Sequence, residues 1–105
     1  MTITILDPLN VLATDQRRVA RRCVRFEFSK YSQQIHRIQL SVRPSTGSGG
    51  FVGQCRVQAK DRQFDEVDVQ VPDDNPESVL RRVIRRAGRT VSLRLGNRTF
   101  GNGAY

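Results

Sequence analysis

Hydrophobic and polar residues alternate with two different periods along the chain, and the first two segments show both. Residues 2–6 alternate with period two, are rich in β-branched side chains and stop at Asp7 and Pro8, which predicts a first strand. From Thr14, which we expect to cap a helix, the apolar residues recur at helical spacing. They form one stripe of the predicted helix, made of Ala20, Val24, Phe28, Tyr31 and Ile35.

Period-two alternation marks three further strands. Their predicted positions are residues 36–43, 51–60 and 66–71. In the first of these, Ile38, Leu40 and Val42 share one face and polar residues share the other. A Ser- and Gly-rich segment, residues 45–50, separates it from the next strand, and the immediate return of alternation predicts a hairpin loop rather than a domain linker.

Residues 75–77 predict the start of a second helix, because Asn caps a helix, Pro suits its first position and Glu complements its dipole. Its apolar stripe consists of Val79, Leu80, Val83, Ile84, Ala87 and Val91. We expect the helix to end near Ser92, although residues 91–95 also fit a strand. The polar, Gly-rich residues 96–105 are expected to form a disordered tail.

These segments predict one domain over residues 1–95, in the order β-α-β-β-β-α. The simplest packing is an α+β fold in which a mixed or antiparallel four-stranded sheet carries both helices on one face. Hydrophobic residues make up 37% of the chain, and one sheet face and two helix stripes are all that this fold has to bury.

Charge adds a functional hypothesis to this outline. The 105 residues include 18 Lys or Arg against 10 Asp or Glu, which gives a net charge of +8. Residues 17–25 and 81–98 hold twelve arginines and no acidic residue. On the helices, the side opposite each apolar stripe carries Arg18, Arg21, Arg22 and Arg25, and Arg81, Arg82, Arg85, Arg86 and Arg89.

Rows of arginine spaced four residues apart repel one another by a few tenths of a kcal/mol per pair, so we expect a ligand outside the domain to compensate them. Arginine binds phosphate with a planar, bidentate fork and stacks on bases, and each neutralised phosphate releases counterions. The pattern therefore favours nucleic acid, without distinguishing RNA from DNA. The alternative is an arginine-rich surface that has no specific ligand.

Other chemistry finds little support in the sequence. No apolar run approaches the roughly 18 residues of a membrane span, and the first residues do not resemble a signal peptide, so we expect a cytoplasmic protein with no membrane partner. Cys23 and Cys55 lack the spacing of metal ligands and are expected to be buried, inert thiols. His36 has no nucleophile or acid beside it, and Glu66 with Asp68 reads as a solvated strand face. We expect no enzymatic activity, metal, cofactor or small-molecule substrate.

Several of these segments together resemble a known family. They are Asn10-Val11 with Thr14 and Arg17-Arg18, the junction at residues 35–42, the strand at residues 55–57 and the helix at residues 78–87. In order and patterning, over roughly residues 2–95, the chain resembles the ribosome hibernation promoting factor and ribosome-associated inhibitor family. It departs from the family at Asp7 and Pro8, where Gly is usual, and in using arginine where lysine is common.

The resemblance implies a fold similar to double-stranded RNA-binding domains and a role as a stress-response regulator of translation. Members dock on the 30S subunit, where basic helices contact 16S rRNA in the decoding channel and block messenger and transfer RNA. Carried over to this chain, that role falls to the nine arginines named above. The chain looks like a short form, which would be monomeric off the ribosome and would not pair ribosomes alone. The alternative is a stand-alone module that binds structured RNA away from the ribosome.

Overall fold

The chain folds into four strands and two helices, and the computed structural model describes residues 1–47 and 49–103, with side chains up to Leu95. The elements are β1 (Thr2–Leu6), α1 (Thr14–Phe28), β2 (Ile35–Pro44), β3 (Phe51–Ala59), β4 (Val67–Asp73) and α2 (Pro76–Gly103). Short 3-10 turns over Ser29–Tyr31 and Lys60–Arg62 follow α1 and β3. The predicted order β-α-β-β-β-α and the α+β class are confirmed.

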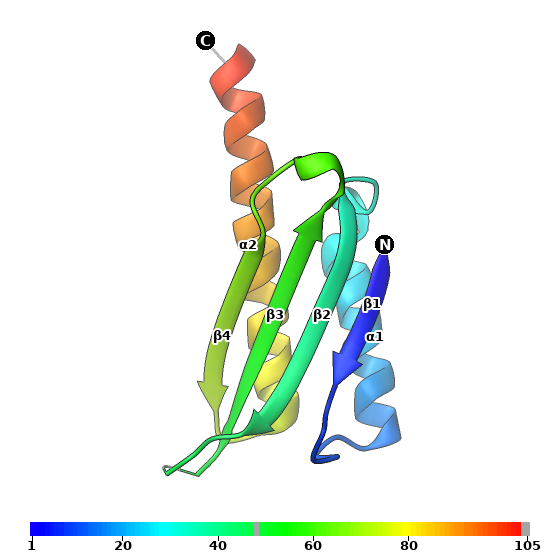
Figure 1. The fold of residues 1–105 in the computed structure, drawn as a ribbon, viewed down its shortest axis with the longest axis vertical. Coiled ribbons are helices and arrows are strands. Elements are labelled where there is room, and N and C mark those ends of the chain that lie inside the picture. Colours follow the sequence, from blue (N-terminus) through cyan, green and yellow to red (C-terminus); the bar gives the residue numbers. More distant parts are fainter. Residues whose placement is uncertain (48, 104–105) are drawn as a thin grey trace.

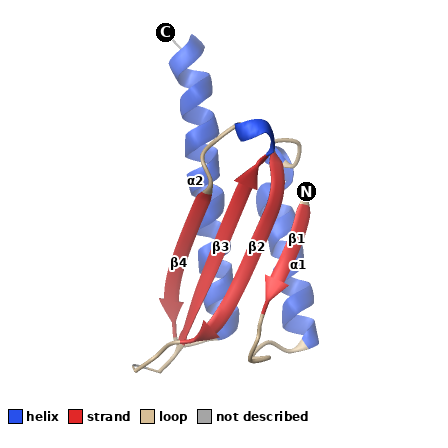
Figure 2. Ribbon diagram, viewed as in Figure 1, coloured by secondary structure: helices blue, strands red, loops and turns tan. Residues whose placement is uncertain are grey.

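The strands form one mixed sheet in the spatial order β1-β2-β3-β4. β1 runs parallel to β2, and the other two pairs are antiparallel. A parallel pair needs a crossover connection, which α1 supplies between β1 and β2. Both helices lie behind the sheet in Figure 1, with α1 near β1 and β2 and α2 behind β3 and β4. The two-layer arrangement is therefore as predicted, and Figure 2 shows the layers by element type.

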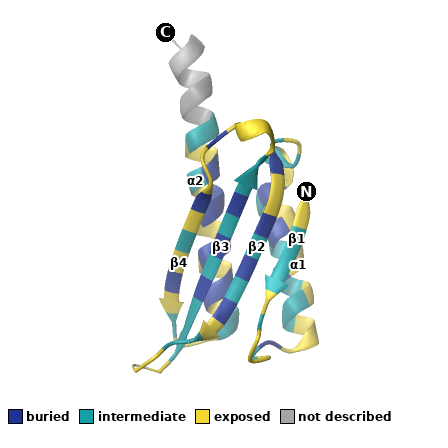
Figure 3. Ribbon diagram, viewed as in Figure 1, coloured by how far each residue is buried: buried dark blue, intermediate teal, exposed yellow. Residues whose placement is uncertain are grey.

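The core lies between the two layers, and its buried residues are dark blue on the strands and helices in Figure 3. Ile38, Leu40 and Val42 of β2 are each at most 1% exposed, because alternation turns all three toward the helices. The helices contribute Val24, Phe28, Val79, Val83 and Val91, all 0% exposed. Leu12 and Phe64, which lie in connecting segments, complete the core and were not predicted.

The start and the end of α1 differ from the prediction. Its N-cap residue is Ala13 rather than Thr14, and the Ala13 N–H donates to Oε1 of Gln16 at 2.7 Å. The helix ends at Phe28, whereas the predicted stripe continued to Ile35. Ile35 is fully buried but begins β2, where it pairs with Ala59. An isoleucine at this position suits the end of a helix or the start of a strand, and its pairing with Ala59 of β3 makes it part of the strand.

Asp7 organises the loop that joins β1 to α1. Its side chain is 1% exposed and accepts hydrogen bonds from the N–H groups of Val11 and Leu12 at 2.8 and 2.9 Å. An ion pair with Arg17 at 3.1 Å completes its partners, and Arg17 also donates to Oδ1 of Asn10. Burial alone raises the pKa of Asp7, but these hydrogen bonds outweigh burial and lower the pKa below its ordinary value. A charged residue therefore fixes how the chain enters α1.

The predicted end of α2 near Ser92 is wrong, because the helix continues to Gly103 and includes residues that fitted a strand or a disordered tail. Val91 remains fully buried and Leu95 packs against the core, so the apolar stripe holds the helix beyond Ser92. Arg94 adds an anchor by donating to the backbone carbonyls of Asp65 and Glu66 at 2.7 and 3.2 Å. The domain limit at residue 95 stays a prediction, and residues 104–105 lie outside the described residues.

Candidate nucleic-acid interface

The exposed sides of the two helices carry all nine arginines that the sequence analysis assigned to RNA binding. All nine are exposed: Arg18, Arg21, Arg22, Arg25, Arg81, Arg82, Arg85, Arg86 and Arg89. The opposite sides of α1 and α2 are buried against the sheet, so the amphipathic pattern forces these residues outward. Their placement agrees with the helical wheels, whereas their contact with RNA stays a prediction.

The arginines of α1 form two rows with different surroundings. Arg21 and Arg25 form one row, and the Arg21 guanidinium donates to the carbonyl oxygen of Ile3 on the edge strand β1 at 3.2 Å. Arg18 and Arg22 form the other row, and Arg22 lines a groove between α1 and α2. The two rows therefore spread positive charge from the edge of the sheet to the helix–helix boundary.

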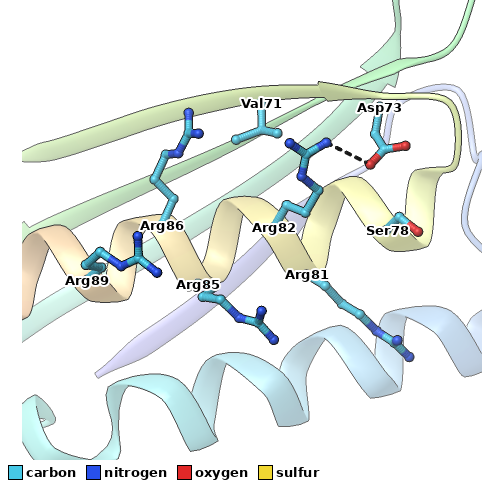
Figure 4. A pocket seen from close by; sticks show the side chains of 8 residues that line it. All are labelled: Val71, Asp73, Ser78, Arg81, Arg82, Arg85, Arg86 and Arg89. Carbon is cyan, nitrogen blue, oxygen red and sulfur yellow. Dashed lines mark hydrogen bonds and ion pairs between the residues drawn. The ribbon is translucent and has the colours of Figure 1, made fainter.

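The arginines of α2 also divide into two sets. In Figure 4, Arg81 and Arg85 extend toward α1, whereas Arg82 and Arg86 extend toward β4. A groove of about 460 Å³ runs along this helix and is lined by Val71, Asp73, Ser78, Arg81, Arg82, Arg85, Arg86 and Arg89. Five arginines therefore line one groove, whose lining includes a single carboxylate, that of Asp73.

Some of the arginines are compensated, contrary to the expectation from the sequence. Arg81 pairs with Glu77 at 2.9 Å, and Arg82 pairs with Asp73 at 3.0 Å. The hydrogen bond from Arg82, followed by one from the Asp74 N–H, lowers the pKa of Asp73 below its ordinary value. Both acids lie just outside the two arginine-rich stretches. Glu77 lies in the first turn of α2, four residues before Arg81, whereas the turn from β4 into α2 brings Asp73 back to the helix.

The remaining arginines of the set stay without a partner. Among the described residues, no hydrogen bond or ion pair reaches the guanidinium groups of Arg18, Arg22, Arg25, Arg85, Arg86 and Arg89. Exposed ion pairs stabilise a protein by at most about 1 kcal/mol, so even the paired Arg81 and Arg82 can exchange partners for a phosphate. The helical layer therefore exposes six guanidinium groups whose positive charge is not compensated by the described residues.

The two helices bring their arginines together in a second groove. Arg22 of α1 and Arg81 and Arg85 of α2 line this inter-helix groove, which has a volume of about 440 Å³. Its other lining residues are Cys23, Phe26, Glu27 and Ile84. The groove joins the rows of α1 and α2, so the predicted continuity of the basic surface is present at this point.

Phe26 is a surface residue that the sequence analysis missed. It lies on α1 four residues after Arg22 and is 83% exposed, so it belongs to the arginine side of the helix. The same helical wheel that separated the arginines from the core places it there, because residues 18, 22 and 26 fall in one row. Phe28, by contrast, lies in the core as expected.

The other candidate residues are placed as structural groups. Cys55 is fully buried, and burial, with a smaller effect of Asp68, raises its thiol pKa to about 12. Cys23 is only half-buried and borders the inter-helix groove, so the prediction that it is buried is only partly right. On the open sheet face, Arg56 pairs with Glu66 at 3.2 Å and lies 3.8 Å from Asp68.

The described residues offer neither a metal site nor a membrane-spanning helix. Within residues 1–47 and 49–103, no group of three or more His, Cys, Asp and Glu side chains could hold a metal ion. Over the same residues, neither α1 nor α2 combines the length and the apolar character that a bilayer span requires.

Fold and surface together define a small α+β domain whose helices, rather than its sheet, carry most of the exposed positive charge. No protein-family model and no curated protein match the sequence. The N-terminal domain of Protein Y from Thermus thermophilus shares the fold, with a TM-score of 0.68 and 12% identity over 87% of this chain and 96% of that chain. A ribosomal subunit interface protein from Coxiella burnetii shares it too, with a TM-score of 0.72 and 10% identity over 88% and 94%. The fold expected from the resemblance is therefore confirmed.

Proposed function

We propose that this protein binds the small ribosomal subunit through the outer face of its two helices and inhibits translation. The observation that carries the proposal is the convergence of Arg22 with Arg81 and Arg85 in the inter-helix groove. The groove along α2, which five arginines line, lies beside it. A surface that concentrates guanidinium groups in this way, most of them unpaired, suits a polyanion whose phosphates approach from more than one side. Folded RNA is such a polyanion.

The solved structures of similar fold favour ribosomal RNA over other folded RNAs as the ligand. One of those proteins is a ribosomal subunit interface protein, and this supports a ribosome-associated role for the present chain. The finer assignment is 16S rRNA in the decoding channel of the 30S subunit, where a bound domain occupies the space of messenger and transfer RNA. Inhibition then follows from steric exclusion in the cytoplasm and needs no catalytic residue, cofactor or bond rearrangement.

Cosedimentation of the purified protein with separated small and large subunits tests this proposal. We expect binding to the small subunit that weakens between about 50 mM and about 200 mM salt, because bound arginines displace counterions. The double variant Arg85→Glu with Arg86→Glu should lose most of this binding. Neither side chain has a partner among the described residues, so the substitutions should leave the fold intact.

A matched control places the same charge change on the open face of the sheet. Arg37 and Arg43 of β2 are both exposed there, and within the described part of the chain their guanidinium groups make only one hydrogen bond, from Arg37 to Oε1 of Gln58. The double variant Arg37→Glu with Arg43→Glu should bind almost as the unchanged protein does. Equal loss in both variants would indicate unspecific charge attraction. Binding to short duplex RNA without binding to subunits would favour the stand-alone RNA-binding module.

A further inference from the structure

Phe26 is the most exposed large hydrophobic residue in the described part of the chain. Its side chain is 83% exposed, compared with 66% for Leu9 and 57% for Leu93. The packing of the domain does not require an aromatic ring at this position. Arg22 and Lys30 lie four residues before and after it on the same side of the chain, so cations flank the ring along α1 and the turn that follows.

Two grooves of similar size meet at Phe26. The inter-helix groove of about 440 Å³ brings Arg22 and Arg85 to one side of the residue. A neighbouring groove of about 510 Å³ brings Lys30 and Arg89 to its other side. Phe26 lines both, so an apolar ring stands between two basic hollows.

Glu27 places a carboxylate beside Phe26, between the two grooves. It lines both grooves and is half-buried against α2, where Gly88 leaves room for it, since a Cβ at Gly88 would collide with the Glu27 side chain. Its carboxylate repels phosphate but can accept a hydrogen bond from an amino group on a base edge. The centre of this surface therefore suits a base, and the cations on either side suit its flanking phosphates.

We propose that Phe26 is a stacking platform for an unpaired RNA base, whose neighbouring phosphates bind Arg22 and Arg85 on one side and Lys30 and Arg89 on the other. The inference rests on the proposed function in so far as RNA is the ligand, and it adds that the RNA is locally single-stranded. A continuous duplex offers this ring only backbone, whereas a bulged or looped base exposes its flat face for stacking. An acidic peptide would use the cations but would leave the ring without a planar partner.

The absence of tryptophan from the sequence allows a direct optical test. Phe26→Trp places a single indole at the platform, and Gln39→Trp places one on the open face of the sheet as a control. We expect single-stranded RNA to quench the fluorescence of Phe26→Trp strongly and that of Gln39→Trp little. An abasic oligonucleotide of equal length and charge should bind without this quenching. Equal quenching of both variants, or by both ligands, would overturn the stacking assignment.

Affinity measurements separate this inference from the proposed function. Phe26→Leu should weaken binding of single-stranded RNA and of small subunits roughly 5- to 150-fold, the range for loss of one aromatic–base stack, and Phe26→Tyr should retain binding. The salt dependence should stay unchanged in both, because no cation is lost. Suppose that Phe26→Leu binds RNA and small subunits with full affinity, while the double variant Arg85→Glu with Arg86→Glu binds them weakly. This result would refute the stacking platform and leave the proposed function standing.

Two further results have defined meanings. If Phe26→Leu loses subunit binding while RNA oligomers bind it normally, the ring contacts ribosomal protein and the proposal is wrong. If the unchanged protein binds RNA with quenching at Phe26→Trp but does not bind small subunits, the platform stands and the ribosomal function fails. Because Phe26 lies outside the core, the melting temperature of each variant should match that of the unchanged protein.

Discussion

Neutralising arginines on the helical layer should make small-subunit binding less dependent on salt, in proportion to the number of arginine–phosphate contacts that are removed. The described structure leaves six of these side chains unpaired: Arg18, Arg22, Arg25, Arg85, Arg86 and Arg89. At about 0.7 to 0.9 released counterions per phosphate, six contacts give a slope of log affinity against log salt of roughly −4 to −5. Affinity should then fall roughly 300- to 2000-fold between about 50 mM and about 200 mM salt.

The perturbation is the double variant Arg85→Gln with Arg86→Gln, which removes charge without introducing repulsion. Its slope should be shallower by roughly 1.4 to 1.8, because two phosphate contacts are lost. Fluorescence anisotropy of labelled protein titrated with purified small subunits at five salt concentrations measures the slope. A wild-type slope shallower than about −2, or an unchanged slope in the variant, would refute the assignment of these arginines to phosphate.

Four predictions concern the fold that holds this surface. Asp7→Ala should lower the free energy of unfolding by about 2–4 kcal/mol in urea titrations, because the side chain accepts three hydrogen bonds while nearly buried. The pKa of Asp7 is lowered in the folded state, so ionised Asp7 stabilises the fold at any pH above its pKa in the unfolded chain. This stabilisation is lost as the pH falls through the pKa of Asp7 in the folded state. The free energy of unfolding of the wild type, but not of Asp7→Asn, should therefore decrease below about pH 4 for this reason. Phe28→Ala should cost about 3–5 kcal/mol by the same assay, since the ring is fully buried. Iodoacetamide should label half-buried Cys23 well before Cys55, whose pKa is raised to about 12, and mass spectrometry of the native protein can count the modified thiols.

Much of the fold could be predicted from local pattern, because alternation and helical spacing each bury one face. Ile38, Leu40 and Val42 illustrate this, since period two alone places them together in the core. Ile35 shows the limit: a buried apolar residue near the end of a helix fits the helical stripe and the next strand equally well. The end of α2 escaped prediction for a similar reason, because the anchor of Arg94 on the chain before β4 joins residues distant in sequence.

The candidate surface was predictable in outline and not in detail. Helical spacing placed the arginines outward, but it could not tell that Asp73 returns to pair with Arg82, which depends on how β4 turns into α2. Phe26 was accessible to the same reasoning, since it shares the row of Arg22. It was missed because the sequence analysis assigned only arginines to the side opposite the apolar stripe.

The central claim, that the arginines of both helices bind 16S rRNA in the decoding channel, is tested most directly by chemical footprinting of small subunits. Hydroxyl-radical cleavage of the rRNA should be compared with no protein, with the unchanged protein and with the Arg85→Glu, Arg86→Glu variant. We predict protection of the nucleotides that border the messenger and transfer RNA path, and loss of that protection with the variant. Protection confined to another region of the subunit, or equal protection by the variant, would contradict the account.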